Sequence, residues 1–298
     1  MSRTSGTSAL GCCWLLLLLV VPPLAAQSSS PLEITTRPAH LTRGTIGSIV
    51  VRASAGAPRL AALAGRAEGE PLHFHPVRDG FAALIGTTLE GGDSVVITLM
   101  PVRPGGERDS LDLAIPVVGG TYRHEQLSVE SKFARPDSAA QRRIGDEIEQ
   151  ARAIAREAHA TPRKWTRPFA VPRPGRVTSR FGTARVLNGE VQSRHLGTDF
   201  AGKVGAPVRA ANAGIVALVA DFYLAGTVVY LDHGEGIVTG YFHLSKALVA
   251  TGDTVTRGQI IGRVGQSGRV TGPHLHWIAR YGRVTVDPMS LLKLRSRF

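Results

Sequence analysis

The sequence predicts a mostly β protein: an N-terminal immunoglobulin-like β-sandwich, one linking amphipathic helix, and a C-terminal β-sheet domain. Three observations predict this order. Short apolar runs separated by Gly, Pro and Asp recur over residues 27–126, a helical periodicity follows, and glycine-rich strand patterns return from Arg173 onward. Strands at this spacing, with turn residues between them, are typical of sandwiches and barrels.

The first 26 residues have the composition of a secretory signal. Arg3 supplies a positive start, Trp14 to Val21 is an unbroken apolar run, and the stretch ends in small residues at Ala26. This order predicts a signal peptide that is cleaved after Ala26. Because the apolar run is too short to span a bilayer comfortably, we expect no stable membrane span after cleavage. The predicted location is the periplasm or the extracellular cell envelope.

Cysteine usage and charge limit the function further. Cys12 and Cys13 both lie in the predicted signal, so the mature chain has no disulfide and relies on its core or on a metal. The formal net charge is +12, but the basic residues are scattered and no nucleic-acid motif accompanies them. We therefore expect electrostatic attraction to anionic envelope polymers and no nucleic-acid partner.

Residues 27–126 form the predicted accessory domain. Alternating apolar runs such as Phe81 to Ile85 and Val95 to Leu99 are its expected strands. A His73-Phe74-His75 pair places two imidazoles on one face of a strand. Because Pro76 follows at once, we interpret this pair as half-exposed strand histidines instead of a metal site.

A helix and a linker occupy residues 127–172. Ser138 followed by Gln141 forms a capping-box signature. Apolar residues then recur at helical spacing on one face, at Ile144, Ile148, Ala151 and Ala155. Repeated prolines between residues 159 and 172 end the helix and predict a linker.

Residues 173–298 contain three clusters of residues that can carry chemistry. The first is His195-Leu196-Gly197-Thr198-Asp199, the second ends in Tyr241-Phe242-His243-Leu244, and the third contains His274-Leu275-His276. If the third is a strand, its two histidines point to the same side. Either both then bind a metal, or one binds it while the other moves protons. Imidazoles, one carboxylate and an open fourth position are the composition of a catalytic zinc site.

In their order, these clusters resemble a known family. His-x-x-x-Asp, then Tyr-x-His-Leu, then Gly-Pro-His-Leu-His is similar to the M23 zinc metallopeptidases, the lysostaphin-type peptidoglycan endopeptidases, over about Val177 to Pro288. The resemblance implies that residues 173–298 are a zinc peptidase domain. Its implied activity is hydrolysis of peptide bonds in peptidoglycan cross-links or stems by zinc-activated water.

The resemblance also assigns roles to residues. It implies that Zn²⁺ is bound by His195, Asp199 and His276, and that His243 and His274 are the other active-site histidines. A glutamate base on a His-Glu-x-x-His helix is missing from the sequence. We therefore expect His274 to accept the proton of water, and His243 to orient water or stabilise the oxyanion, with the reverse division still open.

Neighbouring residues receive structural roles, and two other functions remain. The family pattern makes His233 structural, while we expect Glu235 to lie in a solvated turn and Tyr241 to serve packing. One alternative is a non-catalytic, wall-binding regulator of other cell-wall hydrolases, and another is a peptidase of protein substrates. Residues 186–194 lack the tyrosine that lysostaphin-type members place there, which leaves the scissile bond open. The accessory domain is expected to position the enzyme or to inhibit it.

Overall fold

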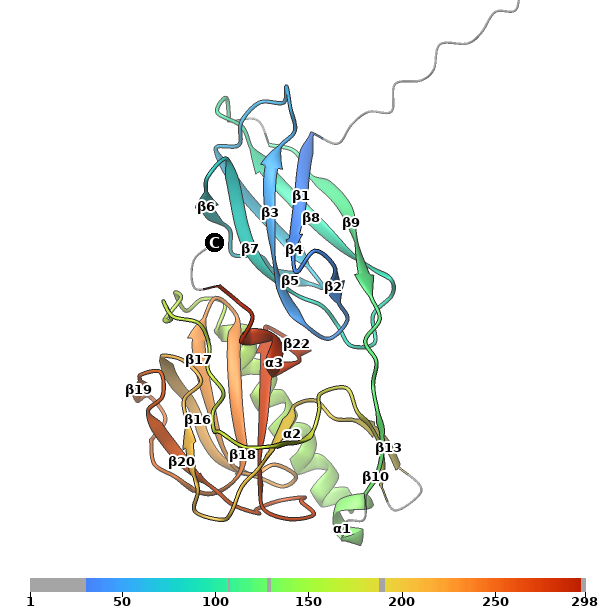
Figure 1. Ribbon diagram of the computed structural model, residues 1–298, viewed down its shortest axis with the longest axis vertical. Coiled ribbons are helices and arrows are strands. Elements are labelled where there is room, and N and C mark those ends of the chain that lie inside the picture. Colours follow the sequence, from blue (N-terminus) through green and yellow to red (C-terminus); the bar gives the residue numbers. More distant parts are fainter. Residues whose placement is uncertain (1–30, 107, 128–129, 188–190, 296–298) are drawn as a thin grey trace, which may run out of the picture. The chain divides into compact units, whose positions relative to one another are not determined.

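Two sheets are formed by the first strands of the computed structural model, which describes residues 31–106, 108–127, 130–187 and 191–295 (Figure 1). The predicted signal peptide, with Cys12 and Cys13, lies outside the described residues. In spatial order, one sheet contains β1 (Leu32–Arg37), β3 (Ile46–Ala53), β7 (Gly80–Gly86) and β6 (His75–Val77). The other contains β2 (Leu41–Thr42), β9 (Leu111–Val118), β8 (Ser94–Val102), β4 (Ala62–Ala67) and β5 (Glu70–Pro71).

Alternation of buried and exposed residues builds these sheets. Along β8, Val95, Ile97 and Leu99 are buried while the residues between them are exposed or half-buried. This two-residue period turns one face of the sheet toward a core and the other toward solvent. The predicted mostly β class is confirmed, and the immunoglobulin-like arrangement stays a prediction.

The segment after β9 contributes a short strand and two helices. Strand β10 (His124–Leu127) pairs in parallel with β12 (Ala184–Leu187), which pairs with β13 (Val191–Arg194) in an antiparallel ribbon. Helices α1 (Ser131–Ala134) and α2 (Ser138–Glu157) follow. Residues 124–127, at the predicted junction between accessory domain and linker, thus belong to the edge of a sheet near the site.

The N-cap of helix α2 lies one residue before the predicted cap. Asp137 is the N-cap, and its side chain accepts a hydrogen bond from the Ala140 amide at 2.8 Å. The predicted capping box is therefore wrong, and Ser138 is the first helical residue. Aspartate and serine are equally good N-caps, and here the aspartate one residue earlier takes that position. Ala151 and Ala155 are buried, whereas Ile148 is 46% exposed.

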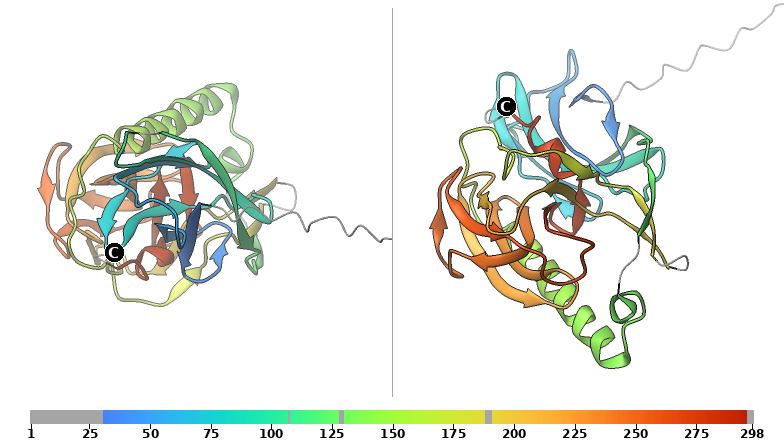
Figure 2. Two further views of the ribbon diagram at one scale, coloured as in Figure 1. Left: turned by 90° about the horizontal axis from the view of Figure 1, so that it is seen from above. Right: turned by 60° about the horizontal axis from the view of Figure 1, so that its bottom comes forward.

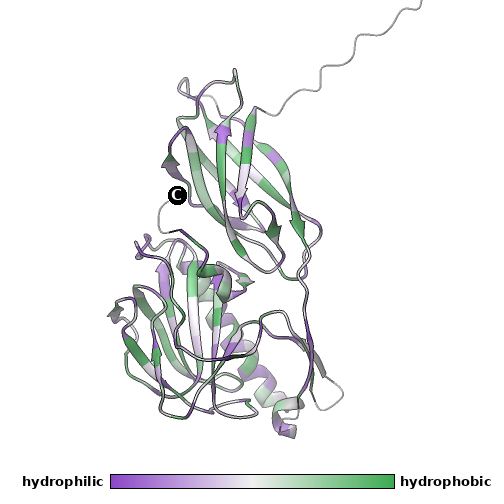
Figure 3. Ribbon diagram, viewed as in Figure 1, coloured by the Kyte–Doolittle hydropathy of each residue, from purple (hydrophilic) through white to green (hydrophobic). Residues whose placement is uncertain are grey.

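Helix α2 packs on one face of the C-terminal sheet (Figure 2). Ala151, Ala155 and Ala158 share a hydrophobic cluster with Phe222 and Tyr230 of that sheet. Small residues on the buried face let the helix backbone approach the strands closely. In Figure 3 the helix alternates between hydrophilic and hydrophobic segments, as a half-buried helix does. The helix therefore belongs with the C-terminal sheet.

The C-terminal sheet carries the site. Its main path, in spatial order, is β11 (Val177–Ser179), β14 (Thr198–Ala201), β21 (His274–Tyr281), β18 (Ile237–Ala247), β17 (Gly226–Gly234), β16 (Gly214–Phe222) and β19 (Thr254–Val255). Three further strands extend this sheet: β20 (Ile260–Val264) pairs with β18, β15 (Pro207–Arg209) pairs with β20, and β22 (Val284–Val286) pairs with β21. Helix α3 (Pro288–Leu291) follows β22. Trp277 of β21 and Tyr241 of β18 are fully buried in the core of this sheet.

Direct contacts join the first two sheets to the C-terminal part. The Asp287 amide donates to the Gly44 carbonyl at 2.6 Å, and the Tyr281 hydroxyl donates to the Pro71 carbonyl at 2.7 Å. Pro31–Phe298 accordingly forms one compact unit, and the domain boundaries at residues 126 and 172 stay predictions. No helix of the described residues has the length and apolar character that crossing a membrane requires.

Candidate metal centre

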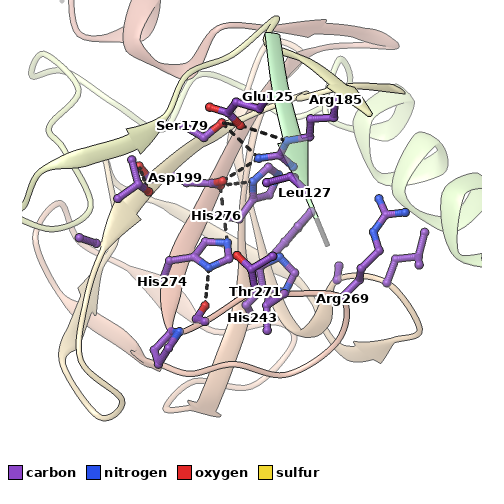
Figure 4. A pocket seen from close by; sticks show the side chains of 18 of the residues that line it. Glu125, Leu127, Ser179, Arg185, Asp199, His243, Arg269, Thr271, His274 and His276 are labelled. Carbon is purple, nitrogen blue, oxygen red and sulfur yellow. Dashed lines mark hydrogen bonds and ion pairs between the residues drawn. The ribbon is translucent and has the colours of Figure 1, made fainter. Parts of the chain in front are cut away.

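The site is built on two neighbouring strands, β14 and β21. Their antiparallel register places Asp199 opposite His276 and Phe200 opposite Leu275. Phe200 and Leu275 are 2% and 0% exposed and point into the core. Because side chains alternate along a strand, Asp199 and His276 project from the other face, together with His274. The three polar side chains line one cavity (Figure 4).

Three side chains bring their ligand atoms together. His195, just after β13, places Nε2 3.0 Å from Asp199 Oδ1 and 2.9 Å from His276 Nδ1. Asp199 Oδ1 and His276 Nδ1 lie 2.6 Å apart. Among the described residues, this is the one group of three His, Cys, Asp or Glu side chains spaced to hold a metal ion.

The hydrogen bonds of His195 show which of its two nitrogens faces the other ligand atoms. Its Nδ1 faces the Arg180 carbonyl oxygen at 2.9 Å, and a carbonyl can only accept, so Nδ1 carries the proton. Nε2 is then the nitrogen that can present a lone pair, and it faces Asp199 Oδ1, which is also an acceptor. Two acceptors this close repel unless a proton or a metal ion lies between them. The donor set therefore fits a metal ion.

Protonation states also suit a metal. Burial lowers the pKa of His276 to about 4, so its ring is neutral near pH 7. Burial raises the pKa of Asp199, but the neighbouring His276 and His195 outweigh it and hold that pKa well below its ordinary value. Metal ligands must be deprotonated, which a neutral imidazole and an ionised carboxylate satisfy.

Gly197 explains why the first cluster contains a glycine. A Cβ at this position would lie 2.6 Å from His276 Cε1 and 2.6 Å from the Trp277 carbonyl oxygen. Real Cβ atoms do not approach so closely, and the carbonyl belongs to a buried strand. The absence of a side chain thus allows the His195–Asp199 segment to lie against β21.

Two further histidines line the same cavity, and in both the Nδ1 nitrogen is bound to a backbone carbonyl. His243 Nδ1 donates to the Ser267 carbonyl at 2.8 Å, and His274 Nδ1 donates to the Gly272 carbonyl at 2.8 Å. Both rings therefore keep Nε2 as an acceptor. Their centroids are 4.9 Å apart, and His274 Nε2 lies 3.7 Å from Asp199 Oδ1.

His243 is held in an unusual backbone conformation. Its φ of 60° lies in the left-handed region, and its amide donates to the Ala225 carbonyl at 2.9 Å. Burial, followed by the neighbouring His276 and His274, lowers the pKa of His243 to about 3. The ring is thus neutral at pH 7 and presents a lone pair instead of a proton.

A second layer of polar residues surrounds the ligands, and no motif in the sequence predicts it. Arg185 Nη2 donates to Asp199 Oδ2 at 2.9 Å, and Ser179 Oγ lies 3.0 Å from His195 Nδ1. Glu125 of β10 accepts from Ser179 Oγ at 3.0 Å although 54 residues separate the two. These contacts depend on strand pairing and on no local motif.

The cavity at the site has a volume of about 580 Å³. Besides the histidines and Asp199, its walls include Leu127 from β10 and Thr271 from the loop before β21 (Figure 4). Arg176, Arg185 and Arg269 give the lining a positive balance. The cavity has a volume in the range that is usual for ligand sites.

The residues predicted to be structural lie away from the cluster. His233 is fully buried, donates from Nδ1 to the Ala213 carbonyl at 2.7 Å and accepts from Thr239 Oγ1 at 2.8 Å. Its burial lowers its pKa to about 4. Tyr241 is also fully buried, and its hydroxyl oxygen accepts from the Ala211 amide at 2.8 Å.

The expected solvated turn at Glu235 is wrong. Its side chain is only 13% exposed and lies 3.0 Å from Arg163 Nε and 2.8 Å from His75 Nε2. His73 instead meets His159, with Nε2 and Nδ1 2.8 Å apart. The two histidines of the His73–His75 pair thus contact different partners.

Comparison with known proteins identifies the C-terminal region. Residues 193–288 match the profile of peptidase family M23. This region is an M23 peptidase domain. The M23 peptidoglycan endopeptidases are metallopeptidases, and the His195–Asp199–His276 cluster gives this domain a group that can hold a metal ion.

Relatives agree with the assignment. Peptidoglycan DD-endopeptidase ShyC of Vibrio cholerae is 42% identical over 104 residues, which are 34% of this chain and 24% of the relative. Peptidoglycan DD-endopeptidase ShyA of the same organism is 43% identical over 112 residues, 37% of this chain and 26% of the relative. The match thus spans about a quarter of the length of these relatives.

A solved structure shares the fold over most of the chain. A crystal structure described as an M23 peptidase from Pseudomonas aeruginosa has a TM-score of 0.62 and 24% identity, and the match covers 84% of this chain and 94% of that one. This likeness includes the strands before the M23 domain as well as the domain itself.

Proposed function

We propose that this protein is an exported zinc metalloendopeptidase that hydrolyses peptide bonds in the cross-links or stems of peptidoglycan. The observation that carries the proposal is the convergence of His195, Asp199 and His276 in a cavity that two further histidines line. The relatives named as peptidoglycan DD-endopeptidases support the substrate class. The predicted signal peptide supports an envelope location.

Zinc is the metal that the donor set suits best. Two imidazoles and one carboxylate are a common catalytic zinc set, and three protein ligands leave one position open. Redox metals held by thiolates do not fit, because both cysteines lie in the predicted signal. When bound, zinc would supply Lewis acidity and lower the pKa of water toward about 7.

His274 is the general base in this proposal. Its Nδ1 proton is held by the Gly272 carbonyl, so Nε2 is the atom that can take a proton from the attacking water. The imidazolium formed in this way would lie beside the ionised Asp199, whose Oδ1 is 3.7 Å away. That carboxylate stabilises the positive charge until the proton passes to the leaving amine.

His243 orients the water in this proposal. Its Nε2 is an acceptor, since Nδ1 donates to the Ser267 carbonyl. With a pKa of about 3, the ring does not become a hydrogen-bond donor to an oxyanion near neutral pH. Of the two roles considered for His243, accepting a hydrogen from water fits the geometry, and donating to the oxyanion does not.

The groove favours an acidic peptide. Arg269 is half-buried beside the site, and burial followed by the nearby Arg185 lowers its pKa. Among the described residues, no carboxylate pairs with its guanidinium, although the group lines the cavity. We propose that a carboxylate of the stem peptide pairs with the Arg269 guanidinium and offsets its positive charge.

Two alternatives differ in what they require. A non-catalytic regulator would not need intact ligands, and the complete His195–Asp199–His276 set favours an enzyme. A peptidase of protein substrates would use the same centre. The first two sheets would position the enzyme or inhibit it. Strand β10, which follows them in the chain, contributes Leu127 to the cavity wall.

Digestion of purified peptidoglycan by the zinc-loaded protein tests the proposal. Mass spectrometry of the soluble products should show muropeptides cut at one type of peptide bond, and His276→Ala should release none. Soluble proteins incubated in parallel should stay intact. An unchanged muropeptide profile would argue for the regulator if the protein binds zinc poorly, and cleavage of soluble proteins alone would argue for the other alternative.

A further inference from the structure

We propose that Glu125 of β10 is a positioning residue of the metal centre. Its carboxylate anchors Ser179 and Arg185, and these two residues hold the ligands His195 and Asp199. The inference rests on the proposed function of the cluster as a zinc site. It makes strand β10, which precedes α2 in the chain, part of the catalytic unit.

One line of contacts runs through Ser179. Its hydroxyl donates to Glu125 Oε2 at 3.0 Å, and its Oγ lies 3.0 Å from His195 Nδ1. His195 Nδ1 also faces the Arg180 carbonyl, so its proton has acceptors on both sides. Residues that fix the second nitrogen of a metal-binding histidine set its tautomer and orientation. Glu125 thereby determines where the Ser179 hydroxyl points.

A second line of contacts runs through Arg185. Glu125 and Arg185 are direct register partners of the parallel pair β10 and β12. The Arg185 guanidinium lies between two carboxylates. Its Nε is 3.8 Å from Glu125 Oε2, and its Nη2 is 2.9 Å from Asp199 Oδ2. It also donates from Nη2 to Ser179 Oγ at 3.2 Å. Figure 4 shows Ser179 and Arg185 beside Glu125, and Arg185 reaching toward Asp199.

The charges explain why the carboxylate matters. Arg185 is the positive group closest to Asp199 apart from the histidines, and an unshared guanidinium would compete with a metal ion for that carboxylate. Glu125 supplies a second carboxylate to Arg185 and adds negative potential behind the ligands. Without Glu125, the Arg185 guanidinium would pair with Asp199 alone and compete more strongly for its carboxylate. The Ser179 hydroxyl would also lose its acceptor. Both changes would weaken metal binding.

The position of Glu125 in the chain gives the inference its consequence. It lies outside residues 193–288, which match the family profile, and outside the predicted peptidase domain 173–298. The centre is therefore completed by a strand from the segment that joins the first sheets to α2. Movement of β10 would change the metal site and the Leu127 wall of the cavity together.

Zinc affinity of full-length variants, measured by competition with a chelator, tests this. Glu125→Gln should weaken zinc binding about 10- to 100-fold, as is usual for partners of metal ligands. Glu125→Asp, which keeps the charge, should recover part of the loss. Glu130→Gln is the matched control, since Glu130 is exposed and pairs with Lys132. Near-ultraviolet circular dichroism confirms that each variant is folded.

A double-mutant cycle separates positioning from general stability. If Glu125 acts through Ser179, the Glu125→Gln, Ser179→Ala double variant should lose little more affinity than Glu125→Gln alone. Additive losses, or a Glu125→Gln affinity within twofold of the unchanged protein, would overturn the inference. Failure of the unchanged protein to bind zinc would instead overturn the proposed function, so the two failures are distinguishable.

Discussion

Asp199 Oδ1 lies 2.6 Å from His276 Nδ1 because the two residues are register partners on β14 and β21. A single pair of backbone strands thus fixes two of the three proposed ligands. His195 reaches the same point from the end of β13, and only the short stretch through Gly197 separates it from Asp199. The rigidity of the centre comes from the sheet instead of from a loop.

Alanine substitutions on β21 should separate metal binding from proton transfer. His276→Ala removes a ligand, so bound zinc and muropeptide release should both fall to background. His274→Ala keeps all three ligands, so zinc should stay bound while kcat falls about 10²- to 10⁴-fold, the usual contribution of a general base. Metal analysis and turnover on muropeptides check this, with exposed His40→Ala as control. Full turnover in both variants would refute the assigned roles.

Gly197→Ala should damage the site although it adds only one methyl group. The new Cβ would meet His276 Cε1 and the Trp277 carbonyl, both 2.6 Å away, and force β14 from β21. We expect lost zinc binding and a melting temperature that no longer rises when zinc is added, whereas the unchanged protein gains stability by mass action. Gly92→Ala is the control, because Gly92 lies outside the cavity and nothing lies within 4 Å of an added Cβ there. Equal zinc responses would contradict the close approach.

His233 should make stability depend on pH. Burial lowers its pKa to about 4 in the folded state from an ordinary value of 6.5, so the unfolded chain binds the proton more readily between these values. Stability is then lost as the pH falls below about 6.5. Between pH 7 and pH 5 this group should cost on the order of 2 kcal/mol. Urea unfolding at both pH values should show a smaller loss in His233→Gln than in the unchanged protein.

The same urea series with His40→Gln, an exposed histidine, should keep the full pH dependence. Identical slopes for His233→Gln and the unchanged protein would show that His233 is not the group responsible.

Arg269 should discriminate between charged and neutral peptides. Amidation of the stem-peptide carboxylates should raise KM for the unchanged protein about tenfold, the scale of one charge-assisted hydrogen bond. Arg269→Gln should show a raised KM for the acidic peptide and little further response to amidation, with kcat maintained. Arg263→Gln, which removes an equal charge outside the cavity, is the control. An amidation effect that persists in Arg269→Gln would place the carboxylate elsewhere.

The ligand positions could be proposed because the three clusters resemble a known family, and part of their arrangement is local. His274 and His276 are two residues apart on a strand, so their common face follows from the backbone, and the structure shows them lining one cavity. The order of the clusters supplied the family. Glu125, Ser179 and Arg185 were missed because their meeting depends on the parallel pairing of β10 with β12, which no local pattern announces.

The errors have equally specific causes. Asp137 and Ser138 are adjacent cap-forming residues, and the side chain that reaches the Ala140 amide is that of Asp137. Glu235 has a φ of 53°, and its side chain meets Arg163 and His75 from distant segments, so glycines on both sides did not imply exposure. In both cases the local sequence allowed two conformations, and contacts in the folded structure decided between them.

His243 shows a compromise between durability and chemistry at one backbone position. A left-handed conformation costs a residue with a Cβ about 1–2 kcal/mol, and glycine would adopt it almost without penalty. The chain nevertheless has an imidazole there, with φ at 60° and Nε2 directed to the cavity. Selection for thermal robustness alone would drive this position toward glycine, and therefore toward a sturdier but catalytically impaired protein.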